Sequence, residues 1–436
     1  MLLYSQYTSP RLSYIIALLG NEIFNEPLRH TTDKTVFLDD SGPKINYSGE
    51  RLSAGEFFIQ NHPLLFEKGI REQKIHCFLF LDQPVFFKSE GDHAFDIFAA
   101  CFYLLSRYEE YLPFEPDHYG RFPYRASLAF REKFLDSPLV NHWLESFKKV
   151  LRAKFPQLLF RIKEFRFIPS YDIDMAYSYR HKGFRRNAGG FVRSFLKGEW
   201  NRLLDRWDVL FQKKKDPFDT YEWLDSLHLY CRTRAYYFFL VARQQKGVDK
   251  NISPALKEMQ ALISYHARGY SLGIHPSWQS GDDDLLLREE IECLENITGI
   301  PVKCSRQHYI RMTLPQTYRN LIRAGIEKDF SMGYGGANGF RASIASSFYW
   351  YDLEEEKQTG LKLYPFCFMD ANAYYETQLT PKEAFDELMG YYRKLKQLNG
   401  LMITVWHNQF FGTDPLFSGW KEVYEVFLKD QVYWDM

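Results

Sequence analysis

Two carboxylates, Asp172 and Asp174, lie near the end of an apolar and aromatic run, residues 165–176 (FRFIPSYDIDMA). In an extended segment, residues two apart point the same way, so both acids would leave the strand on one face. Two like charges this close are unfavourable unless a positive group lies between or beside them. A metal ion would meet that need, whereas a surface loop at a strand end is the alternative reading of a lone DxD.

Further ionisable residues follow the predicted strands downstream. In a parallel barrel, the reactive side chains come from the C-terminal ends of several strands. Beyond Asp172 and Asp174, the predicted strand ends carry His275, then Arg306 with His308 and Tyr309, then Asp329 followed by Arg341, then Asp370, and finally His407. Each alone is typical of a hydrogen-bonded polar residue or a helix cap. Six of the seven predicted strands end in such a residue, and this favours one shared site.

The elements that would position these residues alternate between strand and helix. Strands are predicted at residues 165–171, 235–241, 270–274, 302–309, 326–330, 361–368 and 401–406. Helices are predicted at residues 217–231 (with Asp216 as N-cap), 253–266, 285–295, 315–323 and 381–398. Seven β/α repeats over about 270 residues predict a distorted (β/α)7 barrel. An open doubly wound sheet is the competing topology.

The first part of the chain is predicted to be a small α/β domain, residues 1–157, whose role the sequence does not indicate. Its predicted elements are a helix at 13–19 opened by Pro10, a strand at 35–38, a hairpin at 77–81 and 85–87, a helix at 95–112, and a helix at 137–155 with Ser137 as N-cap. Residues 158–436 would form the barrel.

Composition indicates which binding partners and which cellular compartment to expect. The 436 residues carry no net charge, which does not suggest nucleic acid or an anionic membrane as partner. The six cysteines have no paired spacing, so a disulfide framework is not expected, and no signal peptide or membrane span is recognisable; both observations predict a cytoplasmic protein. Residues 177–215 hold eleven Lys/Arg against three Asp/Glu. A solvated basic insertion is the default reading, and a lid or an anionic-glycan contact is the alternative.

In the order and spacing of these motifs, residues 165–410 resemble the polysaccharide deacetylases, the NodB-homology carbohydrate esterases. Asp172 and Asp174 look like the family's acidic pair. The segment His275–Gln279 is similar to HSxxH, the segment Arg306–Tyr309 in part to RxPY, Asp329 to the fourth motif, and Val405-Trp-His407 to LxH. RYEEYL and DHYGRF resemble an uncharacterised domain that precedes this module in some bacterial proteins.

The resemblance implies a distorted barrel that holds a divalent metal, usually zinc, and hydrolyses N- or O-acetyl groups of a glycan. In these terms Asp174 and His275 would bind metal, Asp172 would be the general base and His407 the general acid. Arg306 would hold Asp172 ionised, with Asp329 behind it, and the backbone N–H of Tyr309 would stabilise the oxyanion. The partner would be an acetylated oligo- or polysaccharide.

The chain departs from the family pattern at two positions. Gln279 stands where the family has its second metal histidine, and His308 where it has the proline of RxPY. The hypothesis is that His308 supplies the third ligand; the alternative is that Gln279, Ser280 or water completes the site. Two other classes stay open: a carbohydrate-binding relative without activity, and a hydrolase of another small amide such as a cyclic ureide.

Overall fold

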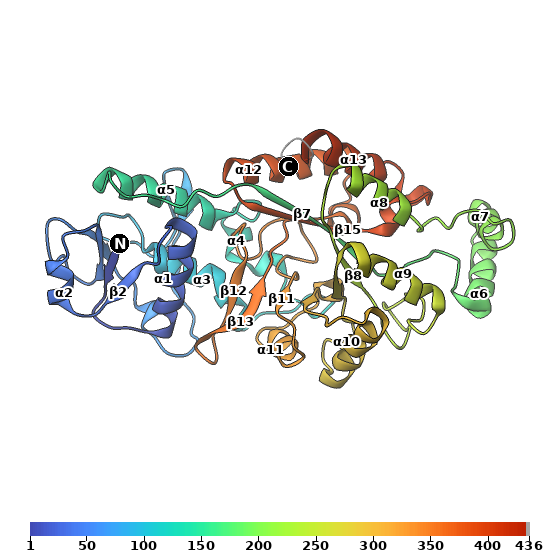
Figure 1. The fold of residues 1–436 in the computed structure, drawn as a ribbon, viewed down its shortest axis with the longest axis horizontal. Helices are drawn as coiled ribbons and strands as arrows, with labels where there is room; N and C mark the ends of the chain where they lie inside the picture. Colours follow the sequence, from blue (N-terminus) through green and yellow to red (C-terminus); the bar gives the residue numbers. More distant parts are fainter. Residues whose placement is uncertain (433–436) are drawn as a thin grey trace.

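The computed structural model describes residues 1–432 and shows a mixed α/β protein (Figure 1). A four-stranded sheet lies in the N-terminal region, and a nine-stranded sheet lies in the rest of the chain. Helices surround both sheets. Among the described residues, no helix combines the length and the apolar character needed to cross a lipid bilayer.

The N-terminal sheet is parallel throughout, with strand order β2-β1-β3-β4. Its strands are β1 (Leu2–Tyr4), β2 (Arg29–Thr31), β3 (Lys44–Ser48) and β4 (Phe57–Gln60). An antiparallel hairpin follows, made of β5 (Phe78–Phe80) and β6 (Gln83–Val85). The helices of this region are α1 (Pro10–Ile23), α2 (Lys34–Asp39), α3 (Ile97–Leu105), α4 (Leu128–Arg131) and α5 (Leu139–Lys154).

The predicted elements of this region are partly confirmed. The helix at 13–19 is present and longer, because Ser9 caps it and Pro10 occupies its first turn. The hairpin is confirmed, with Leu81 and Asp82 at positive φ in its turn. The strand predicted at 35–38 is wrong: these residues lie in α2, whose N-cap Asp33 accepts hydrogen bonds from the N–H groups of two of them.

Two N-terminal helices differ from their predicted bounds. The helix predicted at 95–112 ends at Leu105, because Arg107 adopts a left-handed conformation (φ 55°) and a short 3-10 turn follows. The helix predicted to start behind Ser137 begins at Leu139, and Pro138 is its N-cap residue. The side chain of Ser137 therefore does not have the predicted capping role.

The larger sheet has the strand order β12-β13-β11-β10-β9-β8-β7-β15-β14, and only the β12–β13 pair is antiparallel. Its strands are β7 (Arg166–Ile173), β8 (Tyr236–Phe239), β9 (Ser271–Ile274), β10 (Cys304–Ser305), β11 (Lys328–Asp329), β12 (Phe348–Asp352), β13 (Lys357–Leu363), β14 (Phe368–Met369) and β15 (Leu401–His407). The helices are α6 (Gly183–Leu196), α7 (Trp200–Phe211), α8 (Tyr221–Tyr230), α9 (Lys257–Gly269), α10 (Asp284–Thr298), α11 (Gln316–Arg323), α12 (Pro381–Gln397) and α13 (Trp420–Val426).

The alternation of parallel strands and helices is confirmed, but the sheet does not close into a barrel. The single strand predicted at 361–368 is two strands: β13 pairs with β11, and β14 pairs with β15. Pro365 lies between them and has no N–H for a strand ladder. The chain leaves the sheet there, and the N–H of Phe366 donates to the carbonyl of Met332.

Other differences concern lengths and an insertion. The strand predicted at 302–309 ends at Ser305, and α8 begins at Tyr221 rather than 217. Asp216 does not cap α8; its carboxylate accepts from the backbone N–H groups of residues 178–180. Strand β12 was not predicted. The basic segment contains α6 and α7, a helical hairpin that Figure 1 shows at the end of the molecule opposite α2.

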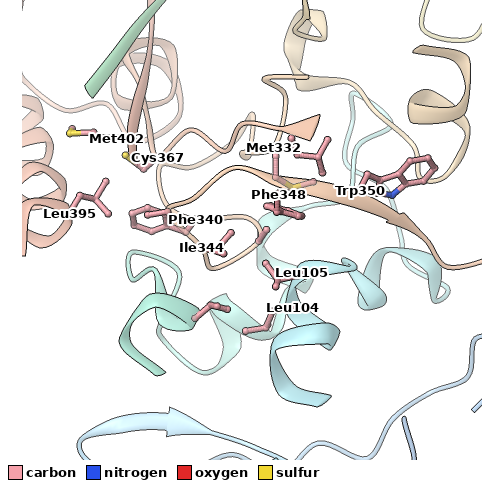
Figure 2. Close-up of a cluster of buried hydrophobic side chains, with 14 of the residues drawn as sticks. Leu104, Leu105, Met332, Phe340, Ile344, Phe348, Trp350, Cys367, Leu395 and Met402 are labelled. Carbon is pink, nitrogen blue, oxygen red and sulfur yellow. The ribbon is translucent and has the colours of Figure 1, made fainter. Parts of the chain in front are cut away.

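The N-terminal region and the larger sheet share one hydrophobic core. Figure 2 shows Leu104 and Leu105 of α3 beside Phe348 of β12, with Phe340 and Ile344 from the preceding loop. All of these side chains are buried. The division of the chain at residue 157 stays a prediction, but the two parts are packed against each other through buried apolar side chains.

Glu110 adds a buried ionic contact between the two parts. Its carboxylate accepts hydrogen bonds from Arg107 (Nε–Oε1, 2.7 Å) and from Arg341 (Nη2–Oε2, 2.5 Å). Burial alone would raise the pKa of this carboxyl, but the two guanidinium groups lower the pKa to about 2. We expect Glu110→Gln to lower the free energy of unfolding by about 3–5 kcal/mol at pH 7, because it leaves two arginines buried with too little negative charge.

The same contact predicts how stability depends on pH. Because the pKa of Glu110 is lower in the folded than in the unfolded chain, its contribution is present above the unfolded pKa and is lost as the pH falls toward about 2. The free energies of unfolding of wild type and Glu110→Gln, measured in urea, should therefore differ strongly at pH 7 and less in acid. The exposed Glu115→Gln is the matched control. Equal stabilities of wild type and Glu110→Gln at pH 7 would contradict the prediction.

Candidate metal centre

The C-terminal ends of β7, β9, β10 and β15 bring the predicted residues to one edge of the larger sheet, with β8 between β7 and β9. In register, Asp172 of β7 lies opposite His407 of β15. Ile274 of β9 lies opposite Ser305 of β10, so His275 and Arg306 leave adjacent strands side by side. Asp174 follows β7 directly. The parallel direction of these strands places all of these side chains at the same end.

Asp174, His275 and His308 each direct one ligand atom toward a common point, and these three atoms all lie within 4.8 Å of one another. Asp174 Oδ1 is 3.1 Å from His275 Nε2, and Asp174 Oδ2 is 3.5 Å from His308 Nε2. Within the described residues, Asp174 Oδ1 is buried and accepts no hydrogen bond. Ligands around a tetrahedral zinc lie about 3.3 Å apart, given metal–ligand bonds of about 2.0–2.1 Å. The donor set therefore fits a divalent metal.

The outer nitrogen of each histidine has its own acceptor. His275 Nδ1 is 2.6 Å from the carbonyl oxygen of Arg306, and His308 Nδ1 is 2.9 Å from Asp249 Oδ1. Such partners hold Nδ1 as the donor and leave Nε2 as an electron-pair donor, which is the usual arrangement behind metal-bound imidazoles. Asp249 is itself buried and accepts from the N–H of Trp278 (3.0 Å).

Gln279 and Ser280, the alternative third ligands, lie behind this set. Gln279 Nε2 donates to Asp249 Oδ2 (3.3 Å), on the far side of His308. Ser280 Oγ lies within hydrogen-bond distance of the carbonyl of Ser277 (3.0 Å) and of Glu290 Oε2 (2.9 Å). The structure thus places His308 with Asp174 and His275, and gives both alternative side chains other partners.

Asp172 lies beside the three-residue set and is held by an arginine. Arg306 Nη1 donates to Asp172 Oδ1 (2.8 Å), while Asp172 Oδ2 is 3.9 Å from His275 Nε2. Arg306 is fully buried, donates to Ser170 Oγ (2.7 Å), and stacks on Phe238 at 4.5 Å. One carboxylate oxygen of Asp172 is thereby fixed, and the other points toward the set.

His407 approaches Asp174 from the neighbouring strand. Its Nε2 is 3.5 Å from Asp174 Oδ2, and its Nδ1 is 2.6 Å from Asp370 Oδ1. Burial would lower the pKa of His407, but the carboxylates of Asp370, Asp174 and Asp172 raise it to about 10. Burial would likewise raise the pKa of Asp174, yet His308, His275 and His407 hold it well below its usual range.

Asp329 and Tyr309 are positioned differently from the other predicted residues. The carboxylate of Asp329 is fully buried and accepts from Ser305 Oγ (2.8 Å) and from Ser331 (N–H, 2.8 Å; Oγ, 2.9 Å), and its pKa is raised by burial. It supports the turn after β10 through these serines. Tyr309 has a left-handed backbone (φ 59°, ψ 11°) and lines the cavity beside the set.

The site opens into a cavity of about 510 Å³. Two acids, Asp370 and Asp249, support the site from outside the residues that line this cavity. Asp370 carried a signal as a strand-end acid, but Asp249 lies in a loop whose sequence has no recognisable motif. His118, Tyr119 and Arg121 line the cavity from the N-terminal region. Their role depends on packing between distant parts of the chain, which the sequence does not display.

Known families and solved structures each match only part of the chain. A profile described as "Family of unknown function (DUF7033)" matches residues 1–156. No curated protein matches the sequence. Three solved structures are similar at 12% identity: a protein assigned as a polysaccharide deacetylase from Mycobacterium smegmatis (TM-score 0.40; 62% of this chain, 84% of that one), the Puue allantoinase (0.39; 61% and 84%), and a polysaccharide deacetylase from Bacillus cereus (0.31; 62% and 89%). Because all three TM-scores lie below 0.5, function is inferred from the site itself.

Proposed function

We propose that this chain is a divalent-metal-dependent hydrolase that removes acetyl groups from an oligo- or polysaccharide. The observation that carries the proposal is the arrangement around Asp174. A three-ligand set is flanked on one side by Asp172, which Arg306 holds, and on the other by His407, which Asp370 holds. A binding protein needs neither a held carboxylate nor a held imidazole at such a set.

Asp174, His275 and His308 would hold the cation, and zinc is the expected metal. When bound, it would supply Lewis-acid chemistry, which polarises an acyl carbonyl and makes a neighbouring water more acidic. The resemblance of residues 165–410 to polysaccharide deacetylases supports an acetyl group as the target. The cavity of about 510 Å³ supports a substrate of the size of sugars.

Asp172 and His407 would carry out the two proton transfers of the reaction. Asp172 would take a proton from water through Oδ2, while Arg306 holds Oδ1 and keeps the carboxylate in place. His407 would give a proton from Nε2 to the departing amine or alkoxide, and Asp370 would hold the Nδ1–H and stabilise the imidazolium. The water oxygen bonds to the acetyl carbonyl carbon, the C–N or C–O bond of the acetyl group breaks, and acetate and the free amine or alcohol are released.

Acetate release tests the proposal. Purified protein, loaded with zinc and compared with chelator-treated protein, would be incubated with acetylated chitooligosaccharides, peptidoglycan fragments, O-acetylated xylan and a cyclic ureide. Metal-dependent acetate from one of the glycans is the expected result. Ureide cleavage without acetate release, or sugar binding without turnover in the zinc-loaded protein, would overturn the proposal.

Asp370→Asn tests the support of the proposed acid. An amide at this position keeps the size of the side chain but removes the charge that stabilises protonated His407. We expect kcat to fall by about 10²-fold, the lower end of what general acid–base catalysis contributes. Metal content, measured by atomic emission, should stay at the wild-type value because Asp370 contacts none of the three ligands. An unchanged kcat would contradict the proposed support of His407 by Asp370.

A further inference from the structure

A loop of the N-terminal region, residues 117–121 (DHYGR), reaches the proposed site. His118, Tyr119 and Arg121 line the same cavity as Asp174 and His407. The loop belongs to the part of the chain that the family of unknown function covers. The cavity is therefore built from both parts of the molecule.

Hydrogen bonds hold the loop in one shape. The carboxylate of Asp117 accepts from the backbone N–H groups of Tyr119 and Arg121 (2.9 Å each) and from Arg121 Nε (2.7 Å). Arg121 is 5% exposed and donates from Nη1 to the carbonyl of Tyr309 (2.9 Å). The approach requires glycine at position 335, because a Cβ on Gly335 would lie 2.0 Å from Arg121 Nη1 and 2.8 Å from the Tyr309 carbonyl.

This contact has a consequence for the Tyr309 backbone. A left-handed conformation (φ 59°) is costly for a residue other than glycine unless its surroundings hold it. Arg121 fixes the carbonyl of Tyr309 from outside the sheet. The N-terminal region thus positions a segment directly beside His308, one of the three proposed metal ligands.

Tyr119 adds an aromatic wall at the mouth of the cavity. Its ring centroid is 4.9 Å from that of Tyr309 and 5.8 Å from that of Trp278, and the latter two are 5.9 Å apart. All three side chains are partly exposed. Aromatic rings of this kind offer an apolar surface to the C–H face of a sugar and keep polar tips for its hydroxyl groups.

We propose that residues 117–121 form a sugar-binding subsite, in which Tyr119 packs against the ring that neighbours the acetylated one. The inference rests on the proposed function and extends it. The substrate would be a chain of sugars rather than a single sugar, and the N-terminal region would contribute to its selection. Arg121 acts as a positioning residue through the Tyr309 backbone.

The test compares N-acetylglucosamine with its tetramer, N-acetylchitotetraose. For Tyr119→Ala, kcat/KM on the tetramer relative to the monomer should fall about tenfold, mainly through KM, as expected for the loss of one aromatic contact. The exposed Tyr7→Ala is the matched control, and it should keep the wild-type ratio. A wild-type ratio in Tyr119→Ala would overturn the subsite.

Binding separates this proposal from the proposed activity. Calorimetric titration of tetramer into Asp172→Asn, with and without Tyr119→Ala, needs no turnover. Weaker binding with Tyr119→Ala supports the subsite even if the wild type releases no acetate, in which case only the proposed activity fails. Equal binding by both proteins, or no binding by either, would overturn the subsite.

A second, independent observation concerns the α6–α7 hairpin. Both helices carry large apolar side chains at helical spacing, and these are exposed rather than packed. The exposed set is Phe184, Val192, Phe195, Leu196, Trp200, Leu204, Trp207 and Phe211. Within it, Phe195 contacts Trp200 (5.6 Å between centroids) and Trp207 contacts Phe211 (4.4 Å), so the set continues across the turn between the helices.

Charge indicates what covers this apolar set. Residues 177–215 have eleven basic and three acidic side chains, an excess of eight positive charges in a chain whose overall net charge is zero. Exposed Trp and Phe combined with Lys and Arg on amphipathic helices are typical of segments that lie in the headgroup layer of an anionic membrane. The hairpin projects from the body, so a flat surface can reach it (Figure 1).

We infer that the hairpin binds the surface of an anionic bilayer. Its base is attached to the wall of the cavity, since Arg186 donates to the carbonyls of Lys250 (2.6 Å) and Asn251 (3.1 Å), and Lys250 lines that cavity. Membrane binding would therefore hold the proposed site at the lipid surface.

Sedimentation with phosphatidylcholine vesicles, with and without phosphatidylglycerol, tests this inference. Wild type should pellet about tenfold more with the anionic vesicles, with a blue shift of tryptophan fluorescence and loss of binding at high salt. Trp200→Ser with Trp207→Ser should lose binding, and Tyr7→Ser should not. Equal binding to both vesicles, no binding, or self-association that only the tryptophan variant abolishes would overturn it.

Discussion

Asp172→Asn is expected to remove nearly all turnover and to leave the metal content unchanged. The amide has the size of the carboxylate and can still accept from Arg306 through its oxygen, so the buried contact with the guanidinium is retained in shape. It cannot take a proton from water, which is the role proposed for Oδ2. Loss of a general base costs about 10²–10⁴-fold in rate, so kcat should fall about 10³-fold.

The neighbouring acid gives the matched comparison. Asp174→Asn replaces a carboxylate whose two oxygens lie 3.1 and 3.5 Å from the two histidine Nε2 atoms, so it should lose both metal and activity. Metal content by atomic emission and acetate release would be measured on both variants. An active Asp172→Asn protein would contradict the assignment of roles, as would an Asp172→Asn protein that no longer binds metal.

The DxD pair shows how far local spacing can predict a site. Alternation along a strand predicts that Asp172 and Asp174 share one face, and the structure brings Asp174 together with two histidines. Asp249 could not be found in this way, because it lies in a loop between β8 and α9 and reaches His308 only through tertiary packing. Residues 118–121 were named only as part of DHYGRF and were not assigned to the site, since they are far from the sheet in sequence.

The fold shows the same division between local and long-range information. Short runs of apolar residues predicted most strands of the larger sheet, because buried parallel strands are apolar throughout. It could not predict that residues 361–368 divide at Pro365 between two partners, β11 and β15, because pairing is decided by distant segments. Local capping decided α2, where Asp33 outweighs the β-branched residues of a predicted strand.

One of these differences, the shorter strand β10, bears directly on the proposed site. Shortening the strand predicted at 302–309 to β10 frees the next residues to turn, so that His308 points into the cavity rather than along the sheet. The sequence departure at this position, histidine where the resembling family has proline, thus coincides with a backbone that can use it. That coincidence is the reason to test His308 directly.

His308→Ala is expected to remove most of the bound metal. The variant deletes one of the three donors that converge within 4.8 Å and leaves Asp174 and His275 as a two-ligand site. After dialysis against excess zinc and then metal-free buffer, metal per chain should fall well below the wild-type stoichiometry, with a matching loss of activity. Asp249→Asn, which changes the acceptor behind His308 Nδ1 and leaves the three donors in place, should weaken metal affinity by about 10–100-fold.

Gln279→Ala distinguishes the two candidates for the third ligand. Gln279 donates to Asp249 Oδ2 and lies behind His308, so its removal should leave the metal stoichiometry at the wild-type value. If Gln279 were the ligand, the two variants would exchange behaviour, with metal retained in His308→Ala and lost in Gln279→Ala. Retention of metal in His308→Ala would contradict the proposed set of two histidines and one carboxylate. Asp174 and His275 alone should not hold a divalent cation stably, so another side chain would have to be the third ligand.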